Sequence, residues 1–176
     1  MRGFRFIVAM ALLLSSTIAS AADPFLGRWS LDPKRSKYPV GDCPKRMTID
    51  MTETEHGVRY HSETQFVNGR SSSADYSANY DEKPVFVTGD RGMLLPVSLK
   101  RVGSHIVVAT YMNGFQIAAT SRRVVSANGD LMTVTTISRS VAGKAVTHVG
   151  VYARRPLSST SKFDLSKAKA NLAISK

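Results

Sequence analysis

Residues 57–80 read GVRYHSETQFVNGRSSSADYSANY, and this stretch decides the fold. Its first half alternates apolar Val58 and Tyr60 with polar neighbours, and its second half alternates in the same way around Tyr76. A period of two is typical of strands that bury one face. The Asn68-Gly69 pair between the halves tolerates the positive φ angles of a tight type I′ turn. The stretch therefore predicts an antiparallel β-hairpin.

The same pattern continues along most of the chain. Two further Asn-Gly pairs, Asn113-Gly114 and Asn128-Gly129, lie between alternating runs, and no convincing amphipathic helix interrupts them. About nine strands are predicted, with a further one at 144–154 if the short 84–88 segment proves irregular. They lie near residues 25–31, 45–53, 57–67, 70–80, 84–88, 96–102, 105–112, 115–126 and 131–140.

Strands joined by tight turns form a meander, and a long meander has two edges that must be paired or left open to aggregation. Closure of the sheet into a barrel removes both edges. We therefore predict an all-β fold, an antiparallel up-and-down meander closed into a β-barrel of 8–10 strands, with a two-sheet sandwich as the competing arrangement.

Both termini differ from this pattern. Residues 1–22 have the features of a secretory signal peptide, with basic Arg2 and Arg5, an apolar run over 6–14 and a small-residue cleavage site at Ala19-Ser20-Ala21. An uncleaved membrane anchor is the alternative. We expect residues 23–155 to form the domain, exported to the periplasm or secreted. The basic tail, 156–176, is either frayed or forms a short helix after Asp164.

Gly27-Arg28-Trp29 gives the first strand a Gly-x-Trp motif, and the chain resembles the lipocalin-like superfamily there. More narrowly, it resembles small exported bacterial lipocalin-like proteins of uncharacterised function. The matching stretches are 27–37, 97–101, 120–126, 131–135 and 149–152. The resemblance implies that Trp29 closes one barrel end, with Arg154 or Arg155 packed on its ring and Gly27 permitting close backbone approach. The Thr-Asp-Tyr motif and the paired cysteines of typical lipocalins are absent.

Catalytic motifs are not recognisable in the sequence. No Gly-x-Ser-x-Gly elbow, phosphate-binding loop or EF-hand is present. Cys43 is interpreted as a free loop thiol, with intermolecular pairing or nucleophilic chemistry as alternatives. His56, His61 and Glu63 fit a solvated strand face better than a metal site, and the early carboxylates Glu53 and Glu55 fit the same description. We expect no cofactor, no metal and no catalytic residue.

A barrel of this size is about wide enough to hold one small ligand. The alternation predicts which residues line the cavity, and the inward set also includes two arginines. The predicted lining residues are Tyr60, Tyr76, Tyr80, Leu99, Arg101, Tyr111, Phe115 and Arg123. A buried arginine is costly unless it is paired, so Arg101 or Arg123 inside the barrel would favour a ligand carboxylate or phosphate. The alternative is that each arginine lies near the rim.

These observations lead to an exported, non-enzymatic protein that binds a small apolar or amphipathic ligand, with an anionic ligand as one option. The alternative is a basic module that docks on anionic envelope components through its surface. The formal charge is +11, and loss of residues 1–22 leaves 22 basic and 13 acidic residues, or +9. Export argues against nucleic acid as a partner. An enzyme that uses lumen residues without a linear motif is a third hypothesis.

Overall fold

The computed structural model describes residues 23–90, 95–140 and 143–156. The predicted signal peptide and residues 157–176 of the tail lie outside the described residues. The described part is all-β and contains nine strands. They are β1 (Gly27–Leu31), β2 (Arg46–Glu53), β3 (Gly57–Gln65), β4 (Ser71–Asn79), β5 (Val97–Gly103), β6 (Ile106–Asn113), β7 (Gln116–Val125), β8 (Leu131–Arg139) and β9 (Ala145–Arg155).

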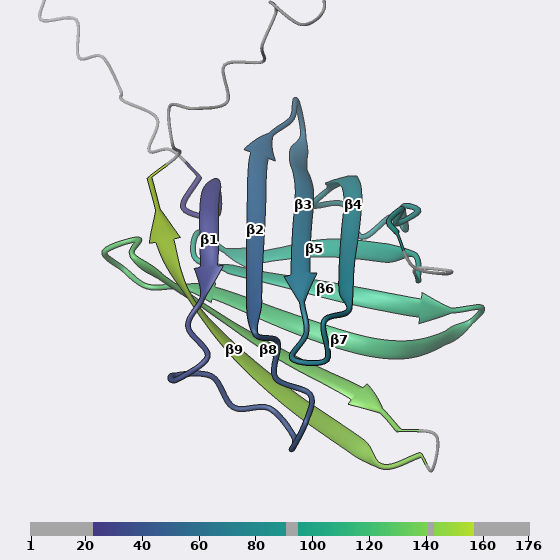
Figure 1. The fold of residues 1–176 in the computed structure, drawn as a ribbon. Coiled ribbons are helices and arrows are strands. Elements are labelled where there is room, and N and C mark those ends of the chain that lie inside the picture. Colours follow the sequence, from purple (N-terminus) through teal and green to yellow (C-terminus); the bar gives the residue numbers. More distant parts are fainter. Residues whose placement is uncertain (1–22, 91–94, 141–142, 157–176) are drawn as a thin grey trace, which may run out of the picture.

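All nine strands belong to one antiparallel sheet in the order β4-β3-β2-β1-β9-β8-β7-β6-β5. The first and last strands are neighbours, because Trp29 on β1 pairs with Arg154 on β9. Figure 1 shows β1–β4 crossing in front of β5–β9, so the sheet curls over on itself. The predicted antiparallel meander is confirmed, and the curled single sheet excludes two separate sheets.

The remaining edges, β4 and β5, are joined by the connection between them. Thr88 in this connection accepts a 2.7 Å hydrogen bond from the Asp75 amide on β4. Val85 donates one of 2.8 Å to the Val97 carbonyl on β5. The barrel is therefore nearly closed. The strand predicted at 84–88 is not formed, because these residues make isolated bridges to two different strands instead of a ladder. The alternative strand predicted near 144–154 is present as β9.

One end of the barrel is sealed by the predicted tryptophan. Trp29 is fully buried and donates a 2.9 Å hydrogen bond from Nε1 to the Phe25 carbonyl. The Arg154 guanidinium lies 4.2 Å from the centre of the indole ring. Gly27 has a φ of 114°, a conformation that other residues rarely adopt, and a Cβ there would lie only 3.0 Å from Arg154 Nη1. Glycine therefore permits both this backbone conformation and the close approach of the guanidinium.

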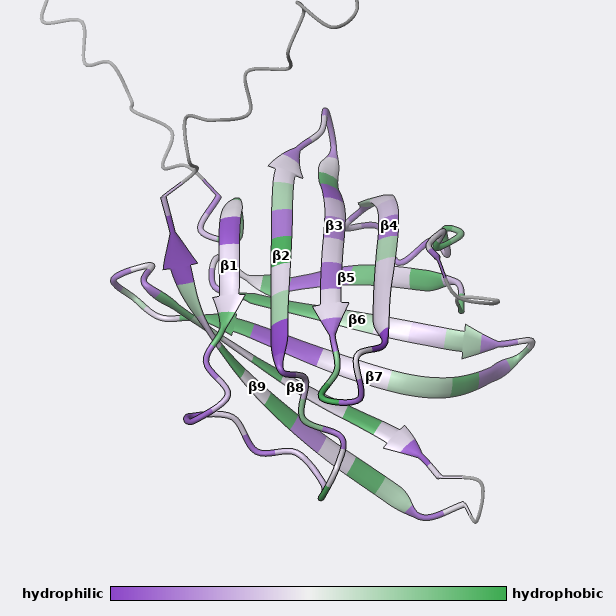
Figure 2. Cartoon of the chain, in the orientation of Figure 1, coloured by the Kyte–Doolittle hydropathy of each residue, from purple (hydrophilic) through white to green (hydrophobic). Residues whose placement is uncertain are grey.

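A meander places successive turns at alternate ends of the barrel. Residues 23–26 and the turns at 54–56, 104–105 and 126–130 share the end sealed by Trp29, which we call the closed end. The loop 32–45, the turns at 66–70 and 114–115, the end of β8 and the start of β9 share the opposite end, the open end. Apolar and polar residues alternate along the strands between the two ends (Figure 2).

The loop 32–45 is held against the barrel wall. Lys37 and Val149 exchange two backbone hydrogen bonds of 2.7 Å, and Ser36 Oγ accepts one of 2.9 Å from the Val151 amide. This attachment brings Tyr38 to the lumen. Within the described residues, no helix has the length and hydropathy that crossing a membrane requires.

Candidate functional site

The barrel lumen contains a cavity of about 220 Å³. Tyr38 from the loop 32–45, Met47 at the start of β2 and His148 on β9 line it, so the cavity extends toward the open end. Tyr60 and Arg123 line the same cavity from β3 and β7. Strand parity places the four strand residues inside, because each belongs to the inward set of its strand.

Arg123 provides the charge of this cavity. Its side chain is buried, with 4% of the residue exposed, and Nη2 donates hydrogen bonds of 2.8 Å to the Tyr76 hydroxyl and 3.4 Å to the Tyr111 hydroxyl. Its Cζ lies 4.9 Å from the centre of the Tyr60 ring. Among the described residues no carboxylate forms an ion pair with it. The prediction that an inward arginine reaches the lumen therefore applies to Arg123.

The partners of Arg123 are neutral. Burial raises the pKa of the Tyr76 hydroxyl and of the Tyr60 hydroxyl, and the charge of Arg123 offsets only part of that effect. Burial alone would lower the pKa of Arg123, but the three nearby hydroxyls raise it more, and the net direction is upward. At neutral pH the lumen therefore holds a guanidinium cation surrounded by phenols and aromatic faces, which suits recognition of an anion.

Tyr60 and Tyr76 form the aromatic floor of this site. Their rings stack with centroids 4.6 Å apart and planes inclined by 10°, because the two residues are directly paired across β3 and β4. Aromatic pairs of this kind contribute about 0.5–1.5 kcal/mol beyond the area that they bury. The Tyr76 hydroxyl is thereby kept in place for Arg123, so the guanidinium is positioned before any ligand arrives.

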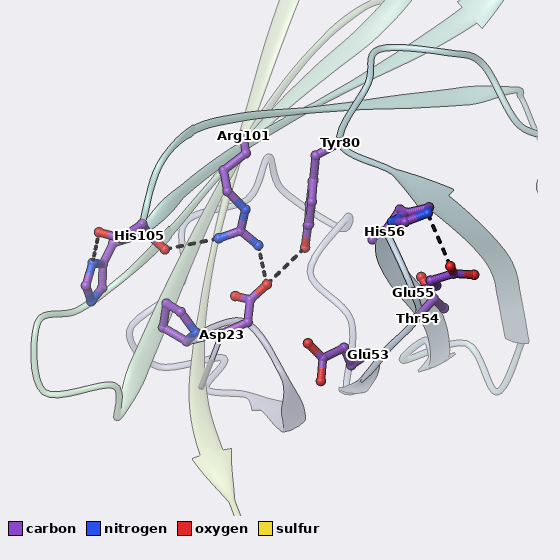
Figure 3. Close-up of a pocket in the computed structure, with 11 residues that line it drawn as sticks. Asp23, Glu53, Thr54, Glu55, His56, Tyr80, Arg101 and His105 are labelled. Carbon is purple, nitrogen blue, oxygen red and sulfur yellow. Dashed lines mark hydrogen bonds and ion pairs between the residues drawn. The ribbon is translucent and has the colours of Figure 1, made fainter. Parts of the chain in front are cut away.

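Arg101 and Tyr80 lie at the closed end, outside the lumen cavity. The Arg101 guanidinium forms an ion pair with Asp23 and lies 4.2 Å from the centre of the Tyr80 ring. The Tyr80 hydroxyl donates a 3.4 Å hydrogen bond to the same carboxylate (Figure 3). These residues border a hollow of about 500 Å³ that also includes Glu53. Arg101 already has its carboxylate, so it needs no ligand anion.

Two other residues of the expected lining do not reach the cavity. Leu99 is fully buried and belongs to the hydrophobic core. Phe115 is fully exposed. Its parity is inward, but it lies in the β6–β7 turn, beyond the part of the sheet that other strands cover. Alternation predicts which face a side chain takes, and it does not predict how far a hairpin projects.

The site also has members that the sequence analysis missed. Tyr38 contacts the His148 ring edge-on, with centroids 5.6 Å apart, and His148 Nε2 lies 3.5 Å from an Asp42 carboxylate oxygen. The Tyr152 hydroxyl donates to Met47 Sδ at 3.1 Å. Tyr38 and Asp42 come from a loop, where alternation gives no signal. For Tyr152 and His148, the parity of β9 would have placed both inside.

The outer face of β2–β4 carries a second polar group. His61 Nδ1 lies 2.8 Å from Asp75 Oδ1, and Nε2 lies 3.7 Å from Glu63 Oε1. Arg28 donates two hydrogen bonds, of 2.7 and 2.9 Å, to the Asp50 carboxylate in the same shallow hollow of about 630 Å³. In the described part of the chain, no three ligating side chains are grouped as a metal would require. These pairs satisfy one another on a solvated face.

Comparison with known proteins supports the fold alone. No family model matches the chain, and no curated protein matches it. The solved structure of Rv2717c from M. tuberculosis is similar, with a TM-score of 0.51 at 14% identity, covering 76% of this chain and 94% of that one. A zebrafish ileal bile acid-binding protein complexed with cholic acid gives a TM-score of 0.47 at 8% identity, covering 75% and 99%. The chain thus shares a barrel fold with Rv2717c.

Proposed function

We propose that this protein is an exported binding protein that holds one small amphipathic anion in its lumen. The anionic group lies against Arg123, and the apolar part lies along the tyrosines and Met47. The observation that carries the proposal is the buried Arg123, which has hydrogen-bond partners that are neutral hydroxyls. A buried cation without a counterion is unfavourable, so a ligand carboxylate or phosphate would complete its environment.

The cavity limits the size of the ligand. Pockets for drug-sized molecules span roughly 300–1,000 Å³. The lumen cavity, at about 220 Å³, is smaller. It corresponds to roughly seven water molecules at their share of liquid volume. We therefore expect a short single-chain or aryl carboxylate, and not a two-chain lipid.

The test compares octanoate with octanol, which has the same chain length and no charge. Isothermal titration of the exported protein should give tighter binding of octanoate. Arg123→Gln should weaken octanoate binding by roughly 10- to 100-fold, the range for a hydrogen bond to a charged group, and leave octanol binding unchanged. Arg122→Gln is the matched control, because Arg122 is the sequence neighbour, carries the same charge and points outward.

Native mass spectrometry adds an independent readout. The exported protein should retain a releasable anionic molecule that is missing from the denatured mass, and Arg123→Gln should lose it while Arg122→Gln keeps it. Circular dichroism verifies that both variants are folded. Equal octanoate affinity in the folded Arg123→Gln protein and in the parent would refute the proposal, as would a lumen that takes up neither probe.

A further inference from the structure

The open end of the barrel carries an unusual set of exposed charges. The loop 32–45, the turn at 66–70, residues 139–140 and 143–144 and the start of β2 contribute eight exposed cations. They are Lys34, Arg35, Lys37, Lys45, Arg46, Arg70, Arg139 and Lys144. Two carboxylates, Asp32 and Asp42, share these segments, and two more, Glu63 and Asp90, line the hollow that Arg46 borders, so the cations outnumber the nearby carboxylates by eight to four. Because the meander brings these turns to one end, residues that are spread over 110 positions of the chain act as one electrostatic surface.

These cations have no ion-pair partners among the described residues, and the two carboxylates of the same segments are already engaged. Asp42 lies 3.5 Å from His148 Nε2. Asp32 accepts a 3.1 Å hydrogen bond from the Lys34 amide in its own turn. Cations elsewhere are more often paired, as Lys100 is with Glu82 at 2.7 Å and Arg28 with Asp50. The excess positive charge therefore belongs to the open end specifically.

Exposed apolar side chains lie at the same end of the barrel. Val40 in the loop 32–45, Val67 in the β3–β4 turn, Phe115 in the β6–β7 turn and neighbouring Ile117 are all exposed. Figure 2 shows apolar residues at the outermost point of the loop 32–45 and in the β3–β4 turn. At the closed end, by contrast, Val102 is the only large apolar residue with comparable exposure within the described chain.

The closed end also differs in charge. Its turns and the adjoining end of β2 include Glu53, Glu55 and Asp130, beside the Asp23 that pairs with Arg101. The carboxylates there balance Arg154 and Arg155 at the end of β9. The molecule therefore has a polarity along the barrel, with one mixed-charge end and one end that is cationic and tipped with apolar residues.

We propose that the open end docks on a lipid bilayer with anionic headgroups. Cations near such a surface are attracted by its negative potential, and apolar side chains at loop tips gain by burial at the boundary between headgroups and acyl chains. A soluble polyanion would use the cations and leave Val40 and Phe115 in water. The combination of both features at one end of the barrel therefore selects a bilayer over a soluble polymer. This docking does not depend on a ligand in the lumen.

The first experiment is flotation of the exported protein with vesicles of phosphatidylcholine containing 30% phosphatidylglycerol, and with vesicles of phosphatidylcholine alone. We expect binding to the anionic vesicles that decreases steeply with salt. The double variant Arg70→Gln/Lys144→Gln should partition at least ten times more weakly, since each cation contributes roughly fivefold near the surface. The control Arg59→Gln/Arg122→Gln removes the same charge from exposed outer faces and should change partition by less than about twofold.

The second experiment tests the exposed apolar side chains of the open end. Val40→Ser and Phe115→Ser should each weaken vesicle binding severalfold, whereas Val102→Ser, the same change at the closed end, should not. All three side chains are exposed, so the fold should persist in each variant.

Three outcomes would overturn the proposal: equal loss in the charge variant and its control, no effect of Val40→Ser and Phe115→Ser, or equal binding to neutral vesicles. If Val40→Ser and Phe115→Ser had no effect while Arg70→Gln/Lys144→Gln lost vesicle binding, the open end would use its charges alone, and a soluble polyanion would be the better partner. Arg123→Gln should lose octanoate and keep vesicle binding, so failure of the lumen proposal and failure of this one give different results.

Discussion

Replacement of Arg154 by leucine should destabilise the barrel severely, although the residue lies at its rim. The guanidinium donates three hydrogen bonds to backbone carbonyls: 2.6 Å to Gly129, 2.5 Å to Leu26 and 2.6 Å to Pro24. It also lies over the Trp29 ring. It thereby connects the β7–β8 turn and the segment before β1 to the last strand.

The expected loss follows from these contacts. A net hydrogen bond contributes about 1 kcal/mol and more when the donor is charged. A partly buried cation–π contact contributes about 1 kcal/mol. Arg154→Leu should therefore lower the free energy of unfolding by about 4 kcal/mol. That is a large fraction of the roughly 5–15 kcal/mol available to a domain.

Urea unfolding is the assay, followed by far-ultraviolet circular dichroism and by the fluorescence of Trp29, the only tryptophan in the chain. Arg155→Leu is the matched control, because the adjacent Arg155 is exposed and has the same charge. It should change stability by less than about 0.5 kcal/mol. A loss below about 1 kcal/mol in Arg154→Leu, or equal losses in the two variants, would refute this account of barrel closure.

Two further predictions concern stability. Burial lowers the pKa of His61, but the Asp75 and Glu63 carboxylates raise it more, so its pKa lies above its usual value. Its contribution to stability is therefore present below about pH 6.5 and is lost as the pH rises through the folded-state pKa. Urea midpoints between pH 5 and 8.5 should show this decline, and Asp75→Asn should flatten it; an unchanged slope in Asp75→Asn would contradict it. Separately, Gly57→Ala should destabilise far more than Gly41→Ala. A Cβ at 57 would lie 2.1 Å from the Ala78 carbonyl oxygen, while one at Gly41 (φ 86°) meets open space and costs about 1 kcal/mol of backbone strain. Equal urea midpoints for the two variants would count against the close approach of β3 and β4.

The strands were predictable because each has one buried face. Val58, Tyr60 and Ser62 on β3 are buried while Arg59 and Glu63 are exposed, so burial follows the period of two that the sequence displays. The 84–88 segment also alternates, and its prediction as a strand was wrong. Val85 and Thr88 bond to different strands, because the connection crosses the gap between the two edges of the sheet. Alternation reports a half-buried extended segment, and it does not report whether that segment forms a ladder.

The site was less predictable than the fold. Parity assigned both Arg101 and Arg123 to the inside of the barrel. Their environments differ because a carboxylate lies beside Arg101 and none pairs with Arg123 among the described residues. Asp23 pairs with Arg101 across 78 positions of the chain, and it precedes the first strand, where no pattern places it. Among the described residues, the hydrogen-bond partners of Arg123 are both hydroxyls. Which of two inward arginines is available for a ligand depends on long-range contacts that strand periodicity does not encode.

The two proposed activities use positive charge in physically different ways, and ionic strength separates them. The eight cations of the open end are solvated, so their attraction for a bilayer, or for an anionic ligand approaching the lumen, falls over a Debye length of about 8 Å at physiological salt. Arg123 lies in the barrel interior, where added ions do not screen a contact once it is formed. Raising the salt from 50 to 500 mM should therefore abolish vesicle binding and slow octanoate association, while the octanoate dissociation rate stays nearly constant. A dissociation rate that rises in parallel with loss of vesicle binding would place the anion at the rim of the barrel and not at Arg123.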